Sequence, residues 1–242
     1  MAIPIEWREK LSTHPPLVNN YCTEPKLFMS AQNEFKQFTD FTSRELYDKM
    51  LINSNSRHVP ASKVKWEESL SSNILNWKLI YSNAFKSCRS TKLQSFQYKI
   101  INRVIACNHW LFNIKIKDNP NCDSCKIDDT LAHFFIECVH VKPFWISFKQ
   151  WWKRCGDIQQ TVSDVDILLG YSTVTPNKCL NYLLIQAKKY IYDKKMNEIK
   201  VISFYSFLHH IKTELILEKS ICDHNGNLNY FEATFGCVFN NL

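Results

Sequence analysis

Residues 122–138 contain three cysteines and a histidine, which together carry the donor atoms of a metal site. Cys122 and Cys125 form a Cys-x2-Cys pair, and His133 and Cys138 follow as His-x4-Cys. Zn²⁺ is commonly bound by thiolate sulfur and imidazole nitrogen, and a Cys-x2-Cys turn brings two sulfurs within reach of one ion. Three thiolates and one imidazole fill a tetrahedral shell and leave no position for water. The spacing therefore predicts a structural zinc ion.

Disulfide formation and thiol redox chemistry use the same residue types, but the surrounding sequence disfavours both. The first residues, "MAIPIEWREKL", show neither the basic nor the apolar region of a secretory signal. We therefore expect an intracellular protein of the nucleus or cytoplasm, where its 10 cysteines stay reduced. A redox Cys-x2-Cys pair normally begins a helix within a βαβ unit, whereas "CDSC" follows the polar stretch "KDNPN". His140 is an alternative fourth ligand, and two other Cys–His pairs have no second half nearby: Cys107 with His109, and Cys222 with His224.

The backbone around the site must bring its two halves together. Residues five apart lie about 140° apart around an α-helix, so His133 and Cys138 cannot face one ion from a continuous α-helix. We therefore expect a short helix that begins near Asp129 or Thr130, with Asp129 as its N-cap. This helix should loosen before Cys138.

Composition predicts a mainly α fold, because only 4 of 242 residues are glycine and 14% are aromatic. We expect an irregular helical domain with a small zinc-stapled CCHC loop. A capping box from Thr42 to Glu45 predicts a helix near the N-terminus, and two amphipathic helices are expected near the C-terminus. The predicted regions are a linker with a small helical segment over 1–60, a helical zinc-binding core over 61–155, a connecting loop over 156–175 and a C-terminal helical segment over 176–242.

A helix predicted within "STKLQSFQYKIINRVIAC", residues 90–107, combines an apolar face with a basic edge. At 100° per residue, Lys92, Lys99 and Arg103 fall within about 20° of one line. The apolar stripe beside this line consists of Leu93, Phe96, Ile100, Val104 and Cys107. Most helices of this kind are core helices with a solvated edge. Only the neighbouring sequence can indicate whether these charges also bind a partner.

The neighbouring sequence is free of acidic residues from Ser69 to Lys117. A solvated face usually mixes charges of both signs, so a tract of one sign predicts a polyanionic partner, RNA or DNA. Aromatic residues interleave with the basic ones, notably Tyr81, Phe85, Tyr98 and Trp110; such residues can stack on bases, but they are more often part of the core. The residues predicted to contact nucleic acid are Lys86, Arg89, Lys92, Lys99, Arg103, Lys115 and Lys117. The metal loop is acidic, so we expect it to stabilise the fold and the basic tract to bind phosphate.

The stretch from Lys92 to Trp145 resembles the reverse-transcriptase zinc-binding domain of LINE-type, non-LTR retrotransposons. It contains the family's Phe-Gln-Tyr-Lys helix, its lysine- and proline-containing lead-in, the Cys-x(2–3)-Cys-x7-His-x4-Cys motif and a Phe-Trp helix. "IPIEWREKL" and "AKKYIYDKK" resemble flanking parts of the family, so the resemblance covers most of the chain. It implies that the three cysteines and His133 are the metal positions of a CCHC zinc knuckle. It also implies a helical module that assists target-primed reverse transcription beside the reverse-transcriptase core of the same element.

No catalytic constellation is found in the sequence. The sequence contains no paired aspartates of the polymerase type, since its one Asp-Asp pair, Asp128 and Asp129, lies inside the metal loop. It also contains neither the acidic and histidine set of an endonuclease nor the spaced carboxylates of a ribonuclease H. We therefore expect a non-catalytic, monomeric module that binds RNA or DNA. No window approaches the ~18–20 apolar residues of a membrane span, so no membrane partner is expected. The alternative is a structural zinc module that docks on the polymerase or on another protein.

Overall fold

The computed structural model of the chain describes residues 27–29, 35–37, 41–45, 59–70, 75–155, 161–171, 177–199 and 201–242. The chain divides into two compact units, Met1–Val59 and Pro60–Leu242. In the first unit, the short strands β1 (Leu27–Met29) and β2 (Phe35–Gln37) pair antiparallel, which the sequence analysis does not predict.

The capping box predicted in the first unit is confirmed. The N–H of Thr42 donates to Oε2 of Glu45 at 2.8 Å, and the N–H of Glu45 donates to Oγ1 of Thr42 at 3.2 Å. The two side chains therefore satisfy each other's backbone donors at the start of the short helix, of which residues 43–45 are described.

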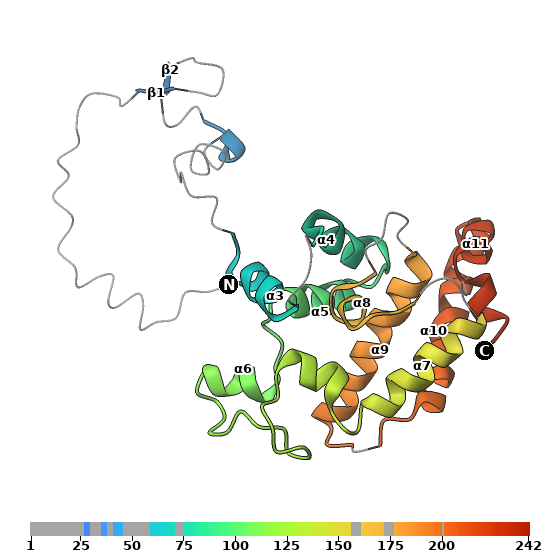
Figure 1. The fold of residues 1–242 in the computed structure, drawn as a ribbon. Coiled ribbons are helices and arrows are strands. Elements are labelled where there is room, and N and C mark those ends of the chain that lie inside the picture. The colour runs from blue at the N-terminus through green and yellow to red at the C-terminus, as the bar shows by residue number, and fades with distance from the viewer. Residues whose placement is uncertain are drawn as a thin grey trace, which may run out of the picture. The chain divides into compact units, whose positions relative to one another are not determined.

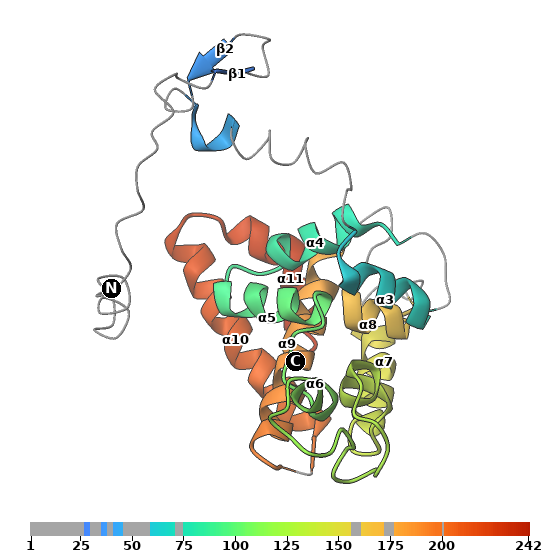
Figure 2. The same ribbon diagram turned by 90° about the vertical axis from the view of Figure 1, so that its left-hand side faces the viewer.

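The second unit is mainly helical, as the composition predicts (Figures 1 and 2). The segments 61–155 and 176–242, which the sequence analysis separates, pack together within it. Its helices are α3 (Ala61–Leu70), α4 (Trp77–Lys86), α5 (Thr91–Ile101), α6 (Asn108–Asn113), the π-helical turn η2 (His133–Glu137), α7 (Lys142–Cys155), α8 (Asp164–Leu169), α9 (Lys178–Met196), α10 (Phe204–His224) and α11 (Leu228–Phe239).

Helix α9 is the central element of this unit (Figure 1). Every residue from Cys179 to Lys188 is buried, because α4, α5, α10, α11 and η2 all pack against this helix. The prediction of an amphipathic helix is therefore wrong for the first half of α9, since a helix that is buried on all sides belongs to a domain interior. From Lys189 onward the helix is partly exposed and can contribute side chains to the surface.

A buried polar network joins α9 to α5 and α8. The side chain of Lys188 is completely buried, and its Nζ donates to Oε1 of Gln97 at 2.5 Å and to the carbonyl oxygen of Leu168 at 3.0 Å. The Nε2 of Gln97 donates to the same carbonyl oxygen at 3.0 Å. This network fixes the position of α5, the helix that carries the predicted basic edge.

Helix α7 packs on α10 through an aromatic cluster. Phe144 and Phe148 of α7 contact Phe204 and Phe207 of α10, with ring centroids 5.2–6.4 Å apart. The Nε1 of Trp145 donates to the carbonyl oxygen of Phe135 at 2.5 Å. Helix α7 is thereby attached to η2, the turn that carries His133 of the metal motif and is called the metal-motif turn below. Aromatic pairs at such distances contribute about 0.5–1.5 kcal/mol beyond their burial.

The stretch 156–175 is predicted to be a connecting loop, but its described part contains the helix α8. Ser163 and Asp166 form a reciprocal capping box, in which the N–H of Ser163 donates to Oδ2 of Asp166 at 2.9 Å. The buried side chains of Ile167, Leu168 and Leu169 follow this cap directly. A Ser-x-x-Asp signal before three apolar residues was therefore present in the sequence, although the helix is only 6 residues long.

The middle helix ends at Ile101 and does not continue to Cys107. Arg103 adopts a left-handed φ of 59°, and the N–H of Val104 donates back to the carbonyl oxygen of Lys99 at 2.9 Å, as in a Schellman helix end. Val104 is 46% exposed, so the predicted apolar stripe is wrong at this position. Beyond the helix end, the 100° periodicity no longer determines where a side chain lies.

Candidate metal centre and basic groove

The first two cysteines of the predicted site lie in one tight turn. An antiparallel bridge between Asn121 and Asp128 closes this turn, and the N–H of Lys126 donates to the carbonyl oxygen of Cys122 at 2.9 Å. Lys126 adopts a left-handed φ of 60°, which reverses the chain directly after Cys125. The turn thereby holds both cysteines on one short hairpin.

The histidine and the third cysteine are brought together by η2. The N–H of Cys138 donates to the carbonyl oxygen of His133 at 2.9 Å, which is the i→i+5 hydrogen bond of a π-helix. The wider turn stacks the fifth residue one turn after the first, whereas an α-helix would separate the two by about 140°. The prediction of a helix that loosens before Cys138 is confirmed, and the π-helical turn is the form that the loosening takes.

All four predicted ligand residues converge. The donor atoms of Cys122, Cys125, His133 and Cys138 lie within 4.8 Å of one another. The Sγ of Cys138 lies 4.0 Å from that of Cys122 and 3.8 Å from that of Cys125. Tetrahedral coordination with metal–sulfur bonds of about 2.3 Å requires sulfur–sulfur distances of about 3.8 Å. The group could therefore hold a metal ion, and no other such group of three or more side chains is found among the described residues.

The imidazole of His133 gives an independent reason to expect an ion. Its side chain is 1% exposed, and neither ring nitrogen has a hydrogen-bond partner within the described part of the chain. An unpaired buried polar group costs about 1–3 kcal/mol, and coordination of a metal would satisfy one of the two nitrogens. Burial also lowers the pKa of His133, which favours the neutral imidazole that coordinates metals.

The thiols of the cluster differ in their electrostatic surroundings. Burial raises the pKa of the Cys138 thiol to about 11. The pKa of Cys125 is lowered: burial acts against this shift, but the N–H of Val139 donates to its Sγ at 3.5 Å and favours the thiolate. The ammonium group of Lys195, at the end of α9, lies 3.8 Å from Oδ1 of Asp129 and favours both thiolates. This lysine comes from a distant part of the sequence, and the spacing of the metal motif does not predict it.

Asp129 is not the N-cap of the metal-motif turn. The helical residues begin at Leu131, and Oγ1 of the preceding Thr130 accepts the N–H of His133 at 3.2 Å. Asp129 is buried, and its Oδ2 accepts the N–H of Asn108 at 3.1 Å, at the start of α6. The Nδ2 of Asn108 donates to the carbonyl oxygen of Asn121 at 2.8 Å. These two hydrogen bonds attach α6 to the metal loop.

The alternative ligands lie outside the cluster. Cys138 belongs to the converging group and His140 does not. His109 instead pairs with a carboxylate, since its Nδ1 lies 2.7 Å from Oδ1 of Asp128. Cys107, Cys222 and His224 likewise belong to no metal-binding group among the described residues.

The basic residues predicted to contact nucleic acid fall into two classes. Three of them are engaged within the fold: the guanidinium of Arg103 lies 4.4 Å from the ring centroid of Trp66, Arg89 lies 3.9 Å from the carboxylate of Glu218, and Lys117 donates to a side chain of α6 at 2.8 Å. Arg103 does not continue the basic edge, because α5 ends before it. The other four predicted residues, Lys86, Lys92, Lys99 and Lys115, are exposed and form no ion pair among the described residues.

A groove of about 750 Å³ lies between α5, residues 104–110 and α9. Lys92 and Lys99 reach it from α5, Trp110 from α6, and Lys189 and Tyr192 from α9. The other lining residues are Thr91, Ser95, Phe96, Val104, Ile105 and Ala106, so no carboxylate lines the groove. Lys189 and Tyr192 are missed by sequence reasoning, because α9 lies far along the chain and only packing brings it to α5.

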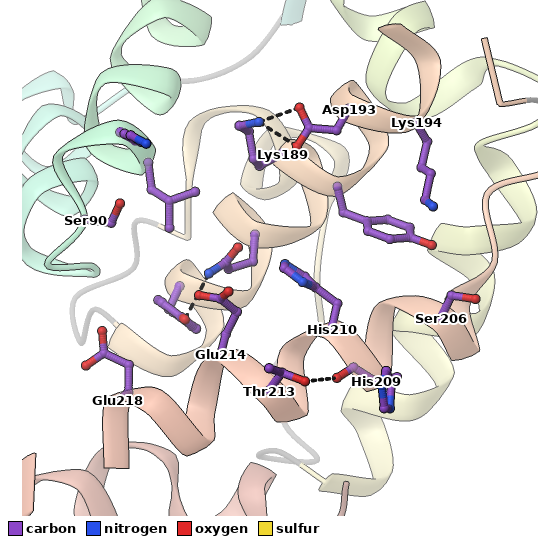
Figure 3. Close-up of a pocket in the computed structure, with 15 residues that line it drawn as sticks. Ser90, Lys189, Asp193, Lys194, Ser206, His209, His210, Thr213, Glu214 and Glu218 are labelled. Carbon is purple, nitrogen blue, oxygen red and sulfur yellow. Dashed lines mark hydrogen bonds and ion pairs between the residues drawn. The ribbon is translucent and has the colours of Figure 1, made fainter. Parts of the chain in front are cut away.

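Figure 3 shows a second cavity of about 630 Å³, which adjoins the groove because Lys92 and Lys189 line both. Lys189 points towards Asp193 and forms an ion pair with it (Figure 3). The wall on α10 carries Glu214 and Glu218 (Figure 3). Carboxylates would repel phosphate, so the carboxylate-free groove is the better candidate for an anionic ligand.

Comparison of the chain with protein-family models finds no match, and comparison with curated proteins finds none either. Among the described residues, no helix is both long enough and apolar enough to cross a membrane. The functional interpretation therefore depends on the cysteine–histidine cluster and on the groove.

Proposed function

We propose that the chain is a non-catalytic nucleic-acid-binding module whose loop is held by a structural Zn²⁺ ion. The observation that carries the proposal is the groove, which combines three lysines with three aromatic residues and has no carboxylate in its lining. Lys92 and Lys99 are exposed and form no ion pair among the described residues, so both are available to neutralise phosphates. Phosphate neutralisation dominates the affinity of most nucleic-acid-binding proteins.

The donor set supports zinc as the ion. Three thiolates and one imidazole with sulfur–sulfur distances of 3.8–4.0 Å match a closed tetrahedral Zn²⁺ site. Four protein donors leave no open position, so such an ion contributes stability and no chemistry. Because Asp129 and Asn121 attach α6 to the metal loop, and α6 carries Trp110, the ion would also stabilise one wall of the groove.

The resemblance of residues 92–145 to the zinc-binding domain of LINE-type reverse transcriptases supplies the biological setting. We infer that the module belongs to a non-LTR retrotransposon reverse transcriptase, where it assists the binding of template RNA or target DNA in target-primed reverse transcription. Polymerisation would be carried out by the reverse-transcriptase core of the same element, in the nucleus or cytoplasm. The chain alone should therefore incorporate no dNTP with Mg²⁺ present.

The proposal is tested by a salt titration of the Lys92→Ala/Lys99→Ala double variant on fluorescein-labelled RNA and DNA. If each lysine neutralises one phosphate of a single strand, the log–log salt slope should fall in magnitude by about 1.4. Affinity at about 0.1 M salt should then fall about 25-fold, and the difference should vanish near 1 M salt. The matched control is Lys153→Ala/Arg154→Ala, which removes two exposed charges from α7 outside the groove. Wild-type affinity and slope in the folded Lys92→Ala/Lys99→Ala protein would contradict the proposal.

A second candidate function is docking on the polymerase or on another protein. It is favoured by apolar side chains that are exposed on the metal loop and its lead-in: Ile116 is 68% exposed, Ile127 55% and Val139 58%. This candidate predicts that Ile127→Ser weakens a protein complex and that the two lysines of α5 contribute nothing to nucleic-acid affinity. The same salt titration therefore separates the two functions.

A further inference from the structure

The groove contains two lysines, Lys92 and Lys99, that form no ion pair among the described residues, and one tryptophan without a ring partner there. Trp110 is half-buried and lines the groove, and its indole stacks on no other ring among the described residues. Tyr192 differs, because its ring packs against Phe96 and Phe134 with centroids 5.5 and 5.9 Å away. Tyr192 thus belongs to the floor of the groove, whereas Trp110 packs against the hydrophobic core, stays partly exposed and lines the groove without a ring partner among the described residues.

We propose that the groove binds a single-stranded segment of RNA or DNA, with one base stacked on Trp110 and the adjacent phosphates at Lys92 and Lys99. The inference rests on the proposed function and specifies that the bound nucleic acid is single-stranded. Inside a duplex the base faces are covered by neighbouring base pairs, so an indole can stack on a paired base only if two base pairs are first separated, whereas an unpaired base is directly accessible. A concave site of about 750 Å³ with an apolar floor accepts splayed bases, whereas duplex phosphates need only exposed cations.

The charges around the groove restrict where the strand can run. On the side of the second cavity, Lys189 is engaged by Asp193, and Glu214 and Glu218 line the wall beyond it (Figure 3). The strand should therefore run along the wall formed by residues 104–110 and avoid the acidic wall of α10. Removal of the Glu214 carboxylate (Glu214→Gln) should then change single-strand affinity by less than about 2-fold.

The test compares one sequence of about 20 nucleotides as single-stranded RNA, single-stranded DNA and a DNA duplex, with fluorescence anisotropy of the full chain. Trp110→Leu should weaken single-strand binding about 5- to 150-fold, the range for one base–aromatic stack, and leave duplex affinity and the salt slope unchanged. Trp110→Phe should restore most of the loss, since it keeps a ring. Tyr205→Leu is the matched control, because Tyr205 is an aromatic residue that is 84% exposed and lies outside both cavities.

A crosslinking experiment on the wild type covers the case in which Trp110→Leu does not fold. A single strand that carries 5-iodouracil should crosslink to the peptide that contains Trp110. Crosslinks that map only elsewhere, or a folded Trp110→Leu protein with wild-type single-strand affinity, would overturn the inference. If Lys92→Ala/Lys99→Ala weakens binding while Trp110→Leu does not, the proposed function stands and the single-strand inference fails. If neither change has an effect, the proposed function fails as well.

Discussion

The stability of the wild-type protein should depend on pH through Lys188, and replacement of this residue by methionine should remove that dependence. The Nζ of this fully buried residue has two acceptors among the described residues, Oε1 of Gln97 and the carbonyl oxygen of Leu168. A neutral amine has two N–H groups and matches them, whereas a third N–H of an ammonium group would have no partner. Burial holds the pKa of Lys188 well below its usual range, which favours the neutral amine in the folded protein.

The magnitude follows from this single proton. An unfolded lysine stays protonated up to about pH 10.4, so a folded state that holds the neutral amine at pH 7 costs about 5 kcal/mol for release of the proton. Methionine avoids that cost but loses two hydrogen bonds of about 1 kcal/mol each and leaves Oε1 of Gln97 unpaired, at about 1–3 kcal/mol. The carbonyl oxygen of Leu168 keeps its bond from Nε2 of Gln97. These terms leave a net stabilisation of about 0–2 kcal/mol at pH 7, so the pH dependence is the sharper measurement.

Between the lowered pKa of the folded state and the ordinary pKa of the unfolded state, the unfolded chain binds one more proton. Wild-type stability should therefore rise with pH by about 1.4 kcal/mol per unit more than that of Lys188→Met, or about 2.7 kcal/mol between roughly pH 7.5 and 9.5. Urea unfolding followed by circular dichroism measures this difference. Lys212→Met, which removes an exposed lysine from α10, is the control and should keep the wild-type slope. Parallel pH profiles of wild type and Lys188→Met would refute the neutral buried amine.

Two further changes test the metal centre and the engaged arginine. Cys125→Ser should lower the zinc content measured by elemental analysis from one ion per chain to well below one and destabilise the loop, since structural zinc contributes on the order of 10 kcal/mol in small peptides; Cys237→Ser, at an exposed cysteine outside the cluster, should keep the ion. Full zinc occupancy in Cys125→Ser would show that this residue is not a ligand. Arg103→Ala should destabilise the fold by about 1–3 kcal/mol through loss of its stacking on Trp66 and its hydrogen bond to Lys65, with little change in nucleic-acid affinity. Arg103→Gly should be less destabilising than Arg103→Ala by about 1 kcal/mol, because glycine adopts a φ of 59° without strain; urea unfolding measures both variants. A loss of nucleic-acid affinity in either folded variant would show that Arg103 contacts the nucleic acid.

Features that depend on near neighbours in the chain can be predicted from the sequence. The four donors of the metal site lie between residues 122 and 138, so one turn and one short helix suffice to bring them together, and their convergence is confirmed. The helical class follows from composition, and the capping box at Thr42 follows from a spacing of three residues. The spacing of His133 and Cys138 even excludes an α-helix between them, although it does not name the π-helical turn.

Only the tertiary structure decides which charges are free and what lies opposite them. Arg103 and Lys99 belong to the same acid-free tract, yet Arg103 stacks on Trp66 while Lys99 lines the groove. Lys189 and Lys195 come from α9, which packs against α5 and η2 and so places one lysine at the groove and the other at the metal cluster. Spacing along a chain sets the direction of a side chain relative to its own helix. Its partners are set by the packing of other helices, because burial and ion pairing depend on distances in space that a local pattern does not contain.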